Sequence, residues 1–279
     1  TRLLTRMNQR RLIEGCCAPI HAVDSKVIGT VLVFRDVTDQ ERLEQELVRA
    51  TRLESVGVLA GGIAHDFNNI LTAVMGNLTL AQLDLAPDTP AAASLQSAEK
   101  AALRARDLTQ QLLTFAKGGE PVRAAVRLDA IVREMTTFAL HGSQVRAAYD
   151  LAPDLWSADA DKGQIGRVVQ NIVINAVQAM PAGGTLRILA RNAPLDATTV
   201  PGLVPGNYIQ IAISDTGEGI QPEHLARIFD PYFTTKKTGT GLGLAAVYSI
   251  VKKHSGHIDV ESQIGQGTTF RLWLPALRT

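Results

Sequence analysis

The chain has 279 residues, of which 46% are hydrophobic and 20% charged, and its 28 basic and 27 acidic residues give a formal net charge of +1. This apolar content is enough to bury a core, which excludes wholesale disorder, and the length fits two domains. The charge balance provides no general attraction to nucleic acid or to an anionic membrane surface. No apolar run approaches the roughly 18 residues that a membrane span needs.

The two cysteines, Cys16 and Cys17, are adjacent, a spacing that disfavours a disulfide, and a reducing cytoplasmic location fits them best. The chain starts at Thr1 rather than at methionine. We therefore expect it to be part of a longer protein, and a membrane anchor in the rest of that protein stays open.

Residues 1–37 end in two runs typical of β-strands, Cys17–Ala22 and Lys26–Arg35, joined by turn residues. Two strands are too few for a stable domain. We interpret this segment as the end of a module whose first half lies upstream.

A helical hairpin is predicted next. From Thr38 to about Leu85 the chain has no proline, and apolar residues recur at alternating spacings of three and four, the pattern of a coiled coil or helix bundle. These residues are Leu53, Val56, Ala60, Ile63, Phe67, Ile70 and Val74. A proline-containing turn at 86–90 precedes a second helical run, which ends at the glycines 118 and 119. Two such hairpins can form a four-helix bundle, so we expect a homodimer.

From Val122 onward, helices and strands alternate, which predicts an antiparallel or mixed sheet with helices on one face. The expected helices are Asp129–Leu140, Lys162–Met180 and Leu244–His254, and the expected strands are Thr185–Asn192, Asn207–Ser214, His257–Glu261 and Thr268–Leu274.

His65 is the first candidate for chemistry. In the heptad of the first helix it falls at the position farthest from the apolar seam, so it is not a core residue. Asp66 is its neighbour, and Asn69 lies one turn further on the same face. An imidazole held by a carboxylate is a competent nucleophile near neutral pH, although a merely solvated histidine would show the same pattern.

Three further patterns suggest a phosphate-bearing ligand. Asn171 and Asn175 share a helix face and could bind a cation and phosphate oxygens, although ordinary polar helix residues would look the same. Asp215-Thr216-Gly217-Glu218-Gly219 follows a strand and either receives a flat ligand or forms a tight turn. Gly239, Gly241 and Gly243 precede a helix whose N-terminus can face an anion. The residues between the two glycine boxes, 228–237, are typical of a mobile lid.

In this order and spacing, the boxes resemble a sensor histidine kinase of the two-component type, in the branch whose phosphoacceptor box reads His-Asp-Phe-Asn-Asn. The resemblance covers about residues 38–275. It implies an α+β multidomain chain: the end of a PAS-like sensor domain over 1–37, a dimerisation and phosphoacceptor hairpin over 38–117, and a catalytic domain over 118–279. That last domain resembles the ATP-binding α/β sandwich of the gyrase, Hsp90, kinase and MutL superfamily.

The resemblance also assigns roles to single residues. His65 matches the phosphorylated histidine, Asp66 the acidic residue that orients or deprotonates it, and Asn69 a residue that positions water when the partner regulator is dephosphorylated. The residues matched to ATP binding are Asn171, Asn175 (the expected Mg²⁺ ligand), Asp215 (which would accept from the adenine amino group), Gly217, Gly219, Phe229, Phe233, Lys236, Gly239, Gly241, Gly243 and Thr268.

The implied activity is ATP- and Mg²⁺-dependent autophosphorylation of His65, followed by transfer to an aspartate of a response regulator or receiver domain. An ATPase or ATP-driven clamp of the same superfamily is the alternative, as is a nucleotide-binding scaffold without catalysis. Such ATPases resemble this domain but carry a glutamate where Asn171 stands, and an amide cannot activate water as a base. Many family members also have a proline shortly after the histidine, whereas this chain reads Asn68-Asn69-Ile70-Leu71-Thr72.

Overall fold

A computed structural model describes residues 2–4, 10–21, 26–83, 85–86, 89–116, 120–196, 200, 202–236 and 239–277. Within these ranges the backbone alone is described for 2, 4, 10, 39, 42–47, 49–50, 52–65, 107–108 and 110–116. The chain divides into two compact units, Thr1–Arg52 and Leu53–Thr279.

The first unit contains an antiparallel sheet in the order β1-β2-β3, formed by β1 (Arg2–Leu4), β2 (Arg10–His21) and β3 (Val27–Asp36). The sequence pattern predicted β3 to within a residue at each end, but it placed the start of β2 at Cys17 and did not indicate β1. The basic and polar residues of 5–11 hide the alternation that marks a strand. At the end of β3, Thr38 begins the following helix, and its Oγ1 accepts a hydrogen bond from the backbone N–H of Leu12 at 2.8 Å.

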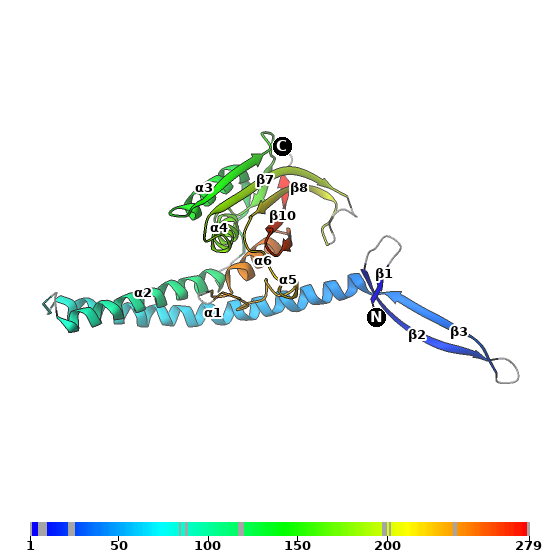
Figure 1. Ribbon diagram of the computed structural model, residues 1–279, viewed down its shortest axis with the longest axis horizontal. Helices are drawn as coiled ribbons and strands as arrows, with labels where there is room; N and C mark the ends of the chain where they lie inside the picture. The colour runs from blue at the N-terminus through cyan, green and yellow to red at the C-terminus, as the bar shows by residue number, and fades with distance from the viewer. Residues whose placement is uncertain are drawn as a thin grey trace. The chain divides into compact units, whose positions relative to one another are not determined.

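Helices α1 (Thr38–Leu83) and α2 (Pro90–Ala116) form the predicted hairpin, and Figure 1 shows them side by side. Helix α1 continues without interruption through its glycines at 57, 61 and 62. Thr89 accepts a hydrogen bond from the N–H of Ala92 at 3.2 Å, and Pro90 occupies the first helical position, so α2 begins with a good cap.

Two different rows of apolar residues run along the described half of α1. The row Leu71, Met75 and Leu78 is half-buried, and Gln82, next in the same row, donates to Glu99 of α2 at 3.0 Å. This row therefore faces α2. The predicted seam lies on another face: Phe67, Ile70 and Val74 are 53%, 60% and 42% exposed. The heptad pattern thus identified the exposed row, and the row that closes the hairpin was not predicted.

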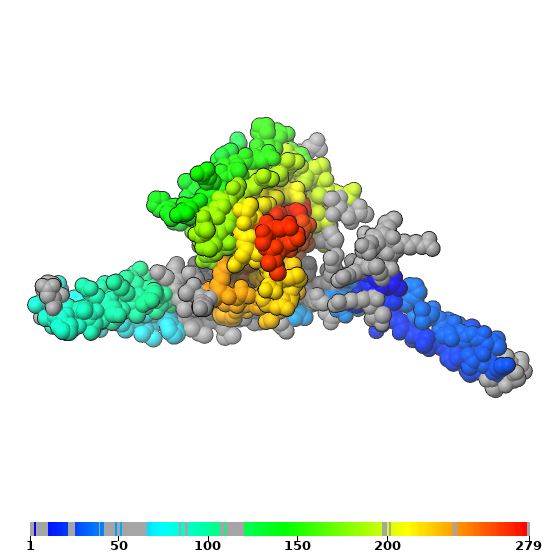
Figure 2. All heavy atoms as spheres, in the orientation of Figure 1, coloured from blue at the N-terminus to red at the C-terminus, as the bar shows by residue number. Residues whose placement is uncertain are grey.

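The α/β domain contains one mixed seven-stranded sheet, ordered β4-β6-β10-β8-β7-β5, with β9 also paired to β10. Only β5 and β7 are parallel neighbours. The elements are β4 (Ala124–Val126), α3 (Leu128–Leu140), β5 (Val145–Leu151), β6 (Ser157–Ala160), α4 (Lys162–Ala179), β7 (Gly184–Leu195), β8 (Gly206–Ser214), α5 (Pro222–Leu225), α6 (Gly243–Lys253), β9 (His257–Gln263) and β10 (Gly267–Leu277). Figure 2 shows the red end of the chain beside the yellow residues, as the pairing of β10 with β8 requires.

The predicted helices and late strands of this domain are confirmed with shifts of a few residues at their ends, but β4, β5, β6 and α5 were missed. The short β4, β6 and α5 have too few residues for a periodic pattern. Strand β5 did carry a signal, because Val145, Ala147, Tyr149 and Leu151 alternate with more exposed residues.

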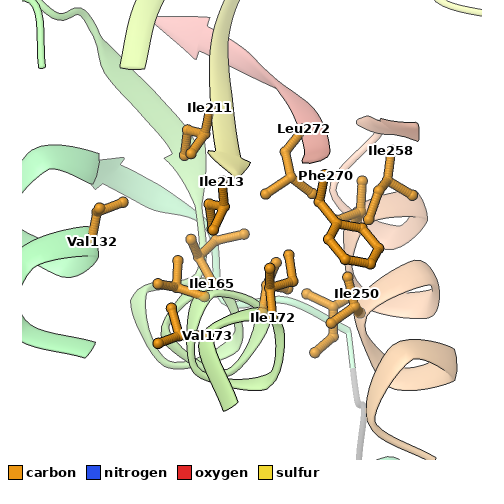
Figure 3. Close-up of a cluster of buried hydrophobic side chains, with 14 of the residues drawn as sticks. Val132, Ile165, Ile172, Val173, Ile211, Ile213, Ile250, Ile258, Phe270 and Leu272 are labelled. Atoms are coloured by element: carbon orange, nitrogen blue, oxygen red, sulfur yellow. The ribbon is translucent and has the colours of Figure 1, made fainter. Parts of the chain in front are cut away.

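The core fills the space between the sheet and the layer of α3, α4 and α6. On β8 and β10, alternate residues such as Ile211, Ile213, Phe270 and Leu272 point toward the helices and are almost completely buried. Figure 3 shows them facing Ile165, Ile172 and Val173 of α4, Ile250 of α6 and Val132 of α3. One face of these strands packs against the core, and successive residues of a strand point to opposite faces. A residue's position along the strand therefore decides whether it points toward the helix layer.

Among the helices that the structure describes, none is both long and apolar enough to cross a membrane.

Candidate nucleotide-binding site

Asp215 follows β8 directly, continues the inward-facing row of Ile211 and Ile213, and is 8% exposed. Its Oδ1 accepts two backbone hydrogen bonds, from Gly217 at 2.9 Å and from Thr268 at 3.1 Å. Among the described residues none donates to Oδ2, so that oxygen can receive a ligand. Burial raises the pKa of Asp215, while the two N–H groups and the Lys236 ammonium favour its charged form.

Glycine permits the close approach of backbone around this carboxylate. Gly267 begins β10 with a φ of +102°, and a Cβ at this position would collide with the carbonyl oxygen of Asp215. A Cβ at Gly217 would lie 2.7 Å from the carbonyl oxygen of Ala179, the last residue of α4. The loop after Asp215 is therefore pressed against the end of α4, and larger residues would push the two apart.

The predicted asparagines lie on α4, one turn apart, and both are half-buried. A Cβ at Gly243, the first residue of α6, would lie 3.7 Å from Oδ1 of Asn171, which places that amide next to the start of α6. The residue before α6 provides no side-chain cap. The first N–H groups of α6 and the Asn171 amide are thus suited to phosphate oxygens.

The loop between α5 and α6 depends on the small size and positive φ of Gly241. Gly241 has a φ of +68°, and a side chain there would collide with the backbone of Tyr232, whose N–H donates to the Gly241 carbonyl at 3.1 Å. Tyr232 itself has a φ of 64°, a region that a non-glycine residue occupies only at a cost. This contact joins the middle of the predicted lid to the glycine box that follows it.

The two phenylalanines of this region do not share one environment. Phe229 is buried in the core, 5.5 Å from the ring of Tyr248 and 6.5 Å from that of Phe270. Phe233 is half-buried, edge-on to His224 and 4.6 Å from the guanidinium carbon of Arg227. Both rings pack in or against the hydrophobic core, which anchors the lid to the domain.

The side chain of Lys236, which was expected to touch phosphate, contacts the helix α4 that carries the two asparagines. Its Nζ donates to Oδ1 of Asn175 at 3.1 Å and to Oε1 of Gln178 at 2.7 Å. Burial lowers the pKa of Lys236, while Glu218 and Asp215 favour its charged form. Gln178 was not predicted from the sequence, although its spacing from Asn171 and Asn175 puts it on the same face. Because Asn175 Oδ1 already receives a cationic group here, its chemistry fits a metal ligand.

The residues near the predicted phosphoacceptor lie on α1, not in the α/β domain. The side chain of His65 lies outside the described residues, so the predicted pairing with Asp66 is untested. Asp66 and Asn69 are both exposed.

The segment that joins the hairpin to the α/β domain is hydrogen-bonded to Asp161, which is itself hydrogen-bonded to a buried histidine that no sequence pattern indicated. The N–H of Val122 donates to Oδ2 of Asp161 at 3.0 Å, and the N–H of Asp161 donates to Nε2 of His254 at 3.0 Å. His254 is 0% exposed, and its Nδ1 lies 2.8 Å from the Ile250 carbonyl, so Nδ1 carries the proton and the ring is neutral. Arg123 donates to the Lys253 carbonyl at 2.6 Å, near the end of α6.

The comparisons with known protein families agree with this geometry. Residues 160–278 match the Histidine kinase-, DNA gyrase B-, and HSP90-like ATPase family, and residues 55–121 match the His Kinase A (phospho-acceptor) domain. The α/β domain is thus an ATP-binding domain of this ATPase class. With the phospho-acceptor domain before it, the chain belongs to the sensor histidine kinases.

The sequence similarity to known relatives extends over almost the whole chain. The chain is 35% identical over 279 residues to sensor kinase CckA of Brucella abortus (strain 2308). This alignment covers 97% of this chain and 30% of CckA. It is 31% identical over 267 residues to sensor histidine kinase ZraS of Escherichia coli (strain K12), covering 92% of this chain and 54% of ZraS. The chain therefore spans only a third to about a half of these relatives.

Solved structures share the fold. Full-length ShkA in complex with AMPPNP aligns with a TM-score of 0.61 at 22% identity, covering 79% of this chain and 46% of ShkA. Histidine kinase ThkA in complex with response regulator TrrA aligns with a TM-score of 0.53 at 20% identity, covering 96% of this chain and 76% of the other. The predicted order, a helical hairpin followed by an α/β sandwich, is confirmed.

Proposed function

We propose that this chain transfers the γ-phosphoryl group of ATP to His65 and then to an aspartate of a response regulator or receiver domain. The observation that carries the proposal is the convergence of a buried carboxylate, Asp215, with the asparagine face of α4 and the uncapped start of α6. A carboxylate suits the adenine amino group, and the amides and N–H groups suit phosphates. The same chain carries a histidine on the helix-face position farthest from the seam.

Each step has an assigned group. An imidazole nitrogen of His65 attacks the γ-phosphorus, its bond to that phosphorus forms as the bond to the ADP oxygen breaks, and Asp66 accepts or holds the imidazole proton. Asn175 would hold Mg²⁺, which neutralises phosphate charge when bound. Lys236 would then exchange its contact with Asn175 for a phosphate oxygen. Asn171 cannot serve as a base for water, which favours transfer over hydrolysis.

Two kinds of partner are part of the proposal. A second copy of the chain would cover the exposed row of Phe67, Ile70 and Val74, since such a row is suited to a helix bundle. A response regulator would accept the phosphoryl group, by analogy with histidine kinase ThkA, which was solved in complex with response regulator TrrA. Asn69, exposed one turn after His65, would orient the water that dephosphorylates this regulator.

The remaining assignments concern the domains and their setting. We interpret residues 1–37 as the end of a PAS-like sensor domain, which the antiparallel β1–β3 sheet supports. The hairpin domain then covers 38–117 and the catalytic domain 118–279. Dependence on ATP supports a cytoplasmic position for these domains.

The test is incubation of the chain with γ-labelled ATP and Mg²⁺, followed by acid and alkali treatment. We expect label that acid removes and alkali leaves, as for phosphohistidine, and a complete loss of label in His65→Gln. Binding of a fluorescent ATP analogue should stay within a few-fold, because His65 lies outside the nucleotide site. Label retained in His65→Gln would contradict the assignment, and phosphate release without any labelled protein would favour the ATPase alternative.

A further inference from the structure

Three oxygen-bearing side chains lie in a row across neighbouring strands at the base of the nucleotide site. Thr268 of β10 is the register partner of Ser262 of β9. On its other side, the Thr268 carbonyl accepts the N–H of Asp215 at 2.9 Å, so these two residues are also opposite each other. All three belong to the alternating rows that point toward the helix layer. Asp215 and Thr268 are the members assigned to nucleotide binding, whereas no role has been given to Ser262.

We propose that Ser262 is a positioning residue that makes the Thr268 hydroxyl a hydrogen-bond acceptor only, so that the site selects a 6-amino purine over a 6-oxo purine. The inference rests on the proposed binding of adenine at Asp215 and deepens it.

The direction of the hydrogen bonds follows from one backbone carbonyl. Ser262 Oγ lies 3.0 Å from the Gly267 carbonyl oxygen, which can only accept, so the Ser262 hydroxyl proton points there. Ser262 Oγ also accepts the N–H of Ile220 at 2.7 Å. The remaining contact, 2.9 Å between Ser262 Oγ and Thr268 Oγ1, must therefore use the Thr268 proton. With that proton committed, Thr268 can offer only lone pairs to a ligand.

The two ligand-facing groups thus have the same polarity. Ionised Asp215 accepts hydrogen bonds and cannot donate, and Thr268 joins it as a second acceptor. An adenine amino group, alone or through a water, supplies donors to such a pair. A purine with an oxygen in place of the 6-amino group would place a third hydrogen-bond acceptor opposite the two acceptors Asp215 and Thr268. A site whose polar groups are left unpaired by the wrong ligand discriminates strongly against it.

An experiment can distinguish the positioning role of Ser262 from a role in packing alone. If the serine hydroxyl is removed, the Thr268 proton is released and can turn toward a 6-oxo group. The loss should then fall unequally on the two bases: ATP binding weakens, while binding of the 6-oxo analogue inosine triphosphate weakens less or improves. A serine that only supported the strand pair would change both affinities by the same factor.

The experiment measures equilibrium binding of ATP and of inosine triphosphate to the 279-residue chain, by competition against a fluorescent ATP analogue. We expect the ratio of the two affinities to fall by roughly threefold to tenfold in Ser262→Ala, the equivalent of one neutral hydrogen bond. Ser262→Thr, which keeps the hydroxyl, should restore the wild-type ratio. Ser262→Cys has nearly the volume of serine but is a poor acceptor, so it should lower the ratio even if Ser262→Ala does not fold.

A matched control lies on the opposite face of the same sheet, between β10 and β8. There Thr269 Oγ1 donates to Ser214 Oγ at 2.9 Å, and Ser214→Ala breaks this second hydroxyl pair, one residue along β10 and β8 from the Thr268–Asp215 pair. It should leave the ratio unchanged. In a Thr268→Val background, Ser262→Ala should also leave the ratio unchanged, because Ser262 acts through Thr268.

The outcomes separate this inference from the function on which it rests. Equal weakening of both nucleotides by Ser262→Ala and Ser262→Cys would overturn the positioning role while the kinase proposal stands. A wild-type chain that forms phosphohistidine from both nucleotides equally well would overturn the base selection alone. A wild-type chain that binds neither nucleotide would overturn the proposed function, and the inference with it.

Discussion

The hairpin and the α/β domain bury their apolar residues in contrasting ways. In the α/β domain, Ile211 and Leu272 are each 1% exposed, between a sheet and a helix layer from the same chain. In α1, Phe67 and Ile70 are more than half exposed in the single chain. An apolar row at bundle spacing that is exposed in the single chain is suited to the second copy that we propose. The α/β domain therefore buries its core within one chain, whereas the proposed dimer would cover the exposed row of the hairpin, and changes to each region should have separate effects.

The contrast extends to the functional residues. Those of the nucleotide site are held by hydrogen bonds from distant segments: Lys236 lies 61 positions from Asn175, and Thr268 lies 53 from Asp215. Asp66 and Asn69 instead stand exposed on a helix. A phosphoacceptor site that serves the proposed regulator needs open access, while the proposed base recognition needs groups fixed in advance.

The largest expected effect is loss of the proposed dimer. Phe67→Glu with Ile70→Glu places two charges per chain in the proposed interface and removes burial worth about 1.5–3 kcal/mol per apolar side chain. We expect the dissociation constant to rise at least about a hundredfold, measured by analytical ultracentrifugation, with unchanged nucleotide affinity. Thr72→Glu, on the helix face opposite the seam, is the control and should remain dimeric. A double variant that stays dimeric would mean that this row is not the interface.

The next prediction separates two activities within the hairpin. Asn69→Ala should lose regulator dephosphorylation and keep much of the autokinase rate, because in the proposed mechanism the amide orients water and has no part in the attack by His65. The measurement is the decay of purified phospho-regulator with ADP, with and without the kinase. Equal acceleration by wild type and variant would remove Asn69 from this role.

A change to Asp215, the carboxylate that we propose binds the adenine, should have an intermediate effect. Asp215→Asn replaces a charged acceptor with an amide, and the loss of a charge-assisted hydrogen bond of about 1.5–3 kcal/mol predicts roughly tenfold to a hundredfold weaker ATP binding. Asn175→Asp should instead lower the autophosphorylation rate more than the nucleotide affinity, since it alters the phosphate end of the site. Normal binding of a fluorescent ATP analogue by Asp215→Asn would show that the adenine contact is misplaced.

The smallest effect is on the pH dependence of stability. Burial lowers the pKa of His254, with Arg123 also lowering it and the contacts from Ile250, Asp161 and Asp159 opposing the shift. The unfolded chain therefore binds this proton more readily than the folded one as the pH falls below about 6.5. The free energy of unfolding should then fall with decreasing pH, by at most about 1.4 kcal/mol per pH unit. Urea unfolding from about pH 7.5 to about pH 5.5, a range that spans the ordinary histidine pKa, measures it, and His254→Gln should flatten the slope relative to wild type.

Several features could be predicted from the sequence because they depend on near neighbours. Helical spacing and a proline-containing turn were enough for α1 and α2, and the repeated glycines marked the loops at Asp215 and before α6. Residue type also set the chemistry: an amide at Asn171 is not a base in any fold. The order of these local patterns sufficed to indicate the family.

The tertiary structure decided which distant groups meet, because that depends on strand register and on the packing of helices far apart in the chain. No local pattern distinguishes the row of Leu71, which closes on α2, from the exposed row of Phe67, since both are apolar at helical spacing. Nor does the sequence show that Ser262 lies opposite Thr268, or that Lys236 reaches Gln178. A slip of one residue in β9 would turn Ser262 away from the site, so its role follows from the register of the sheet.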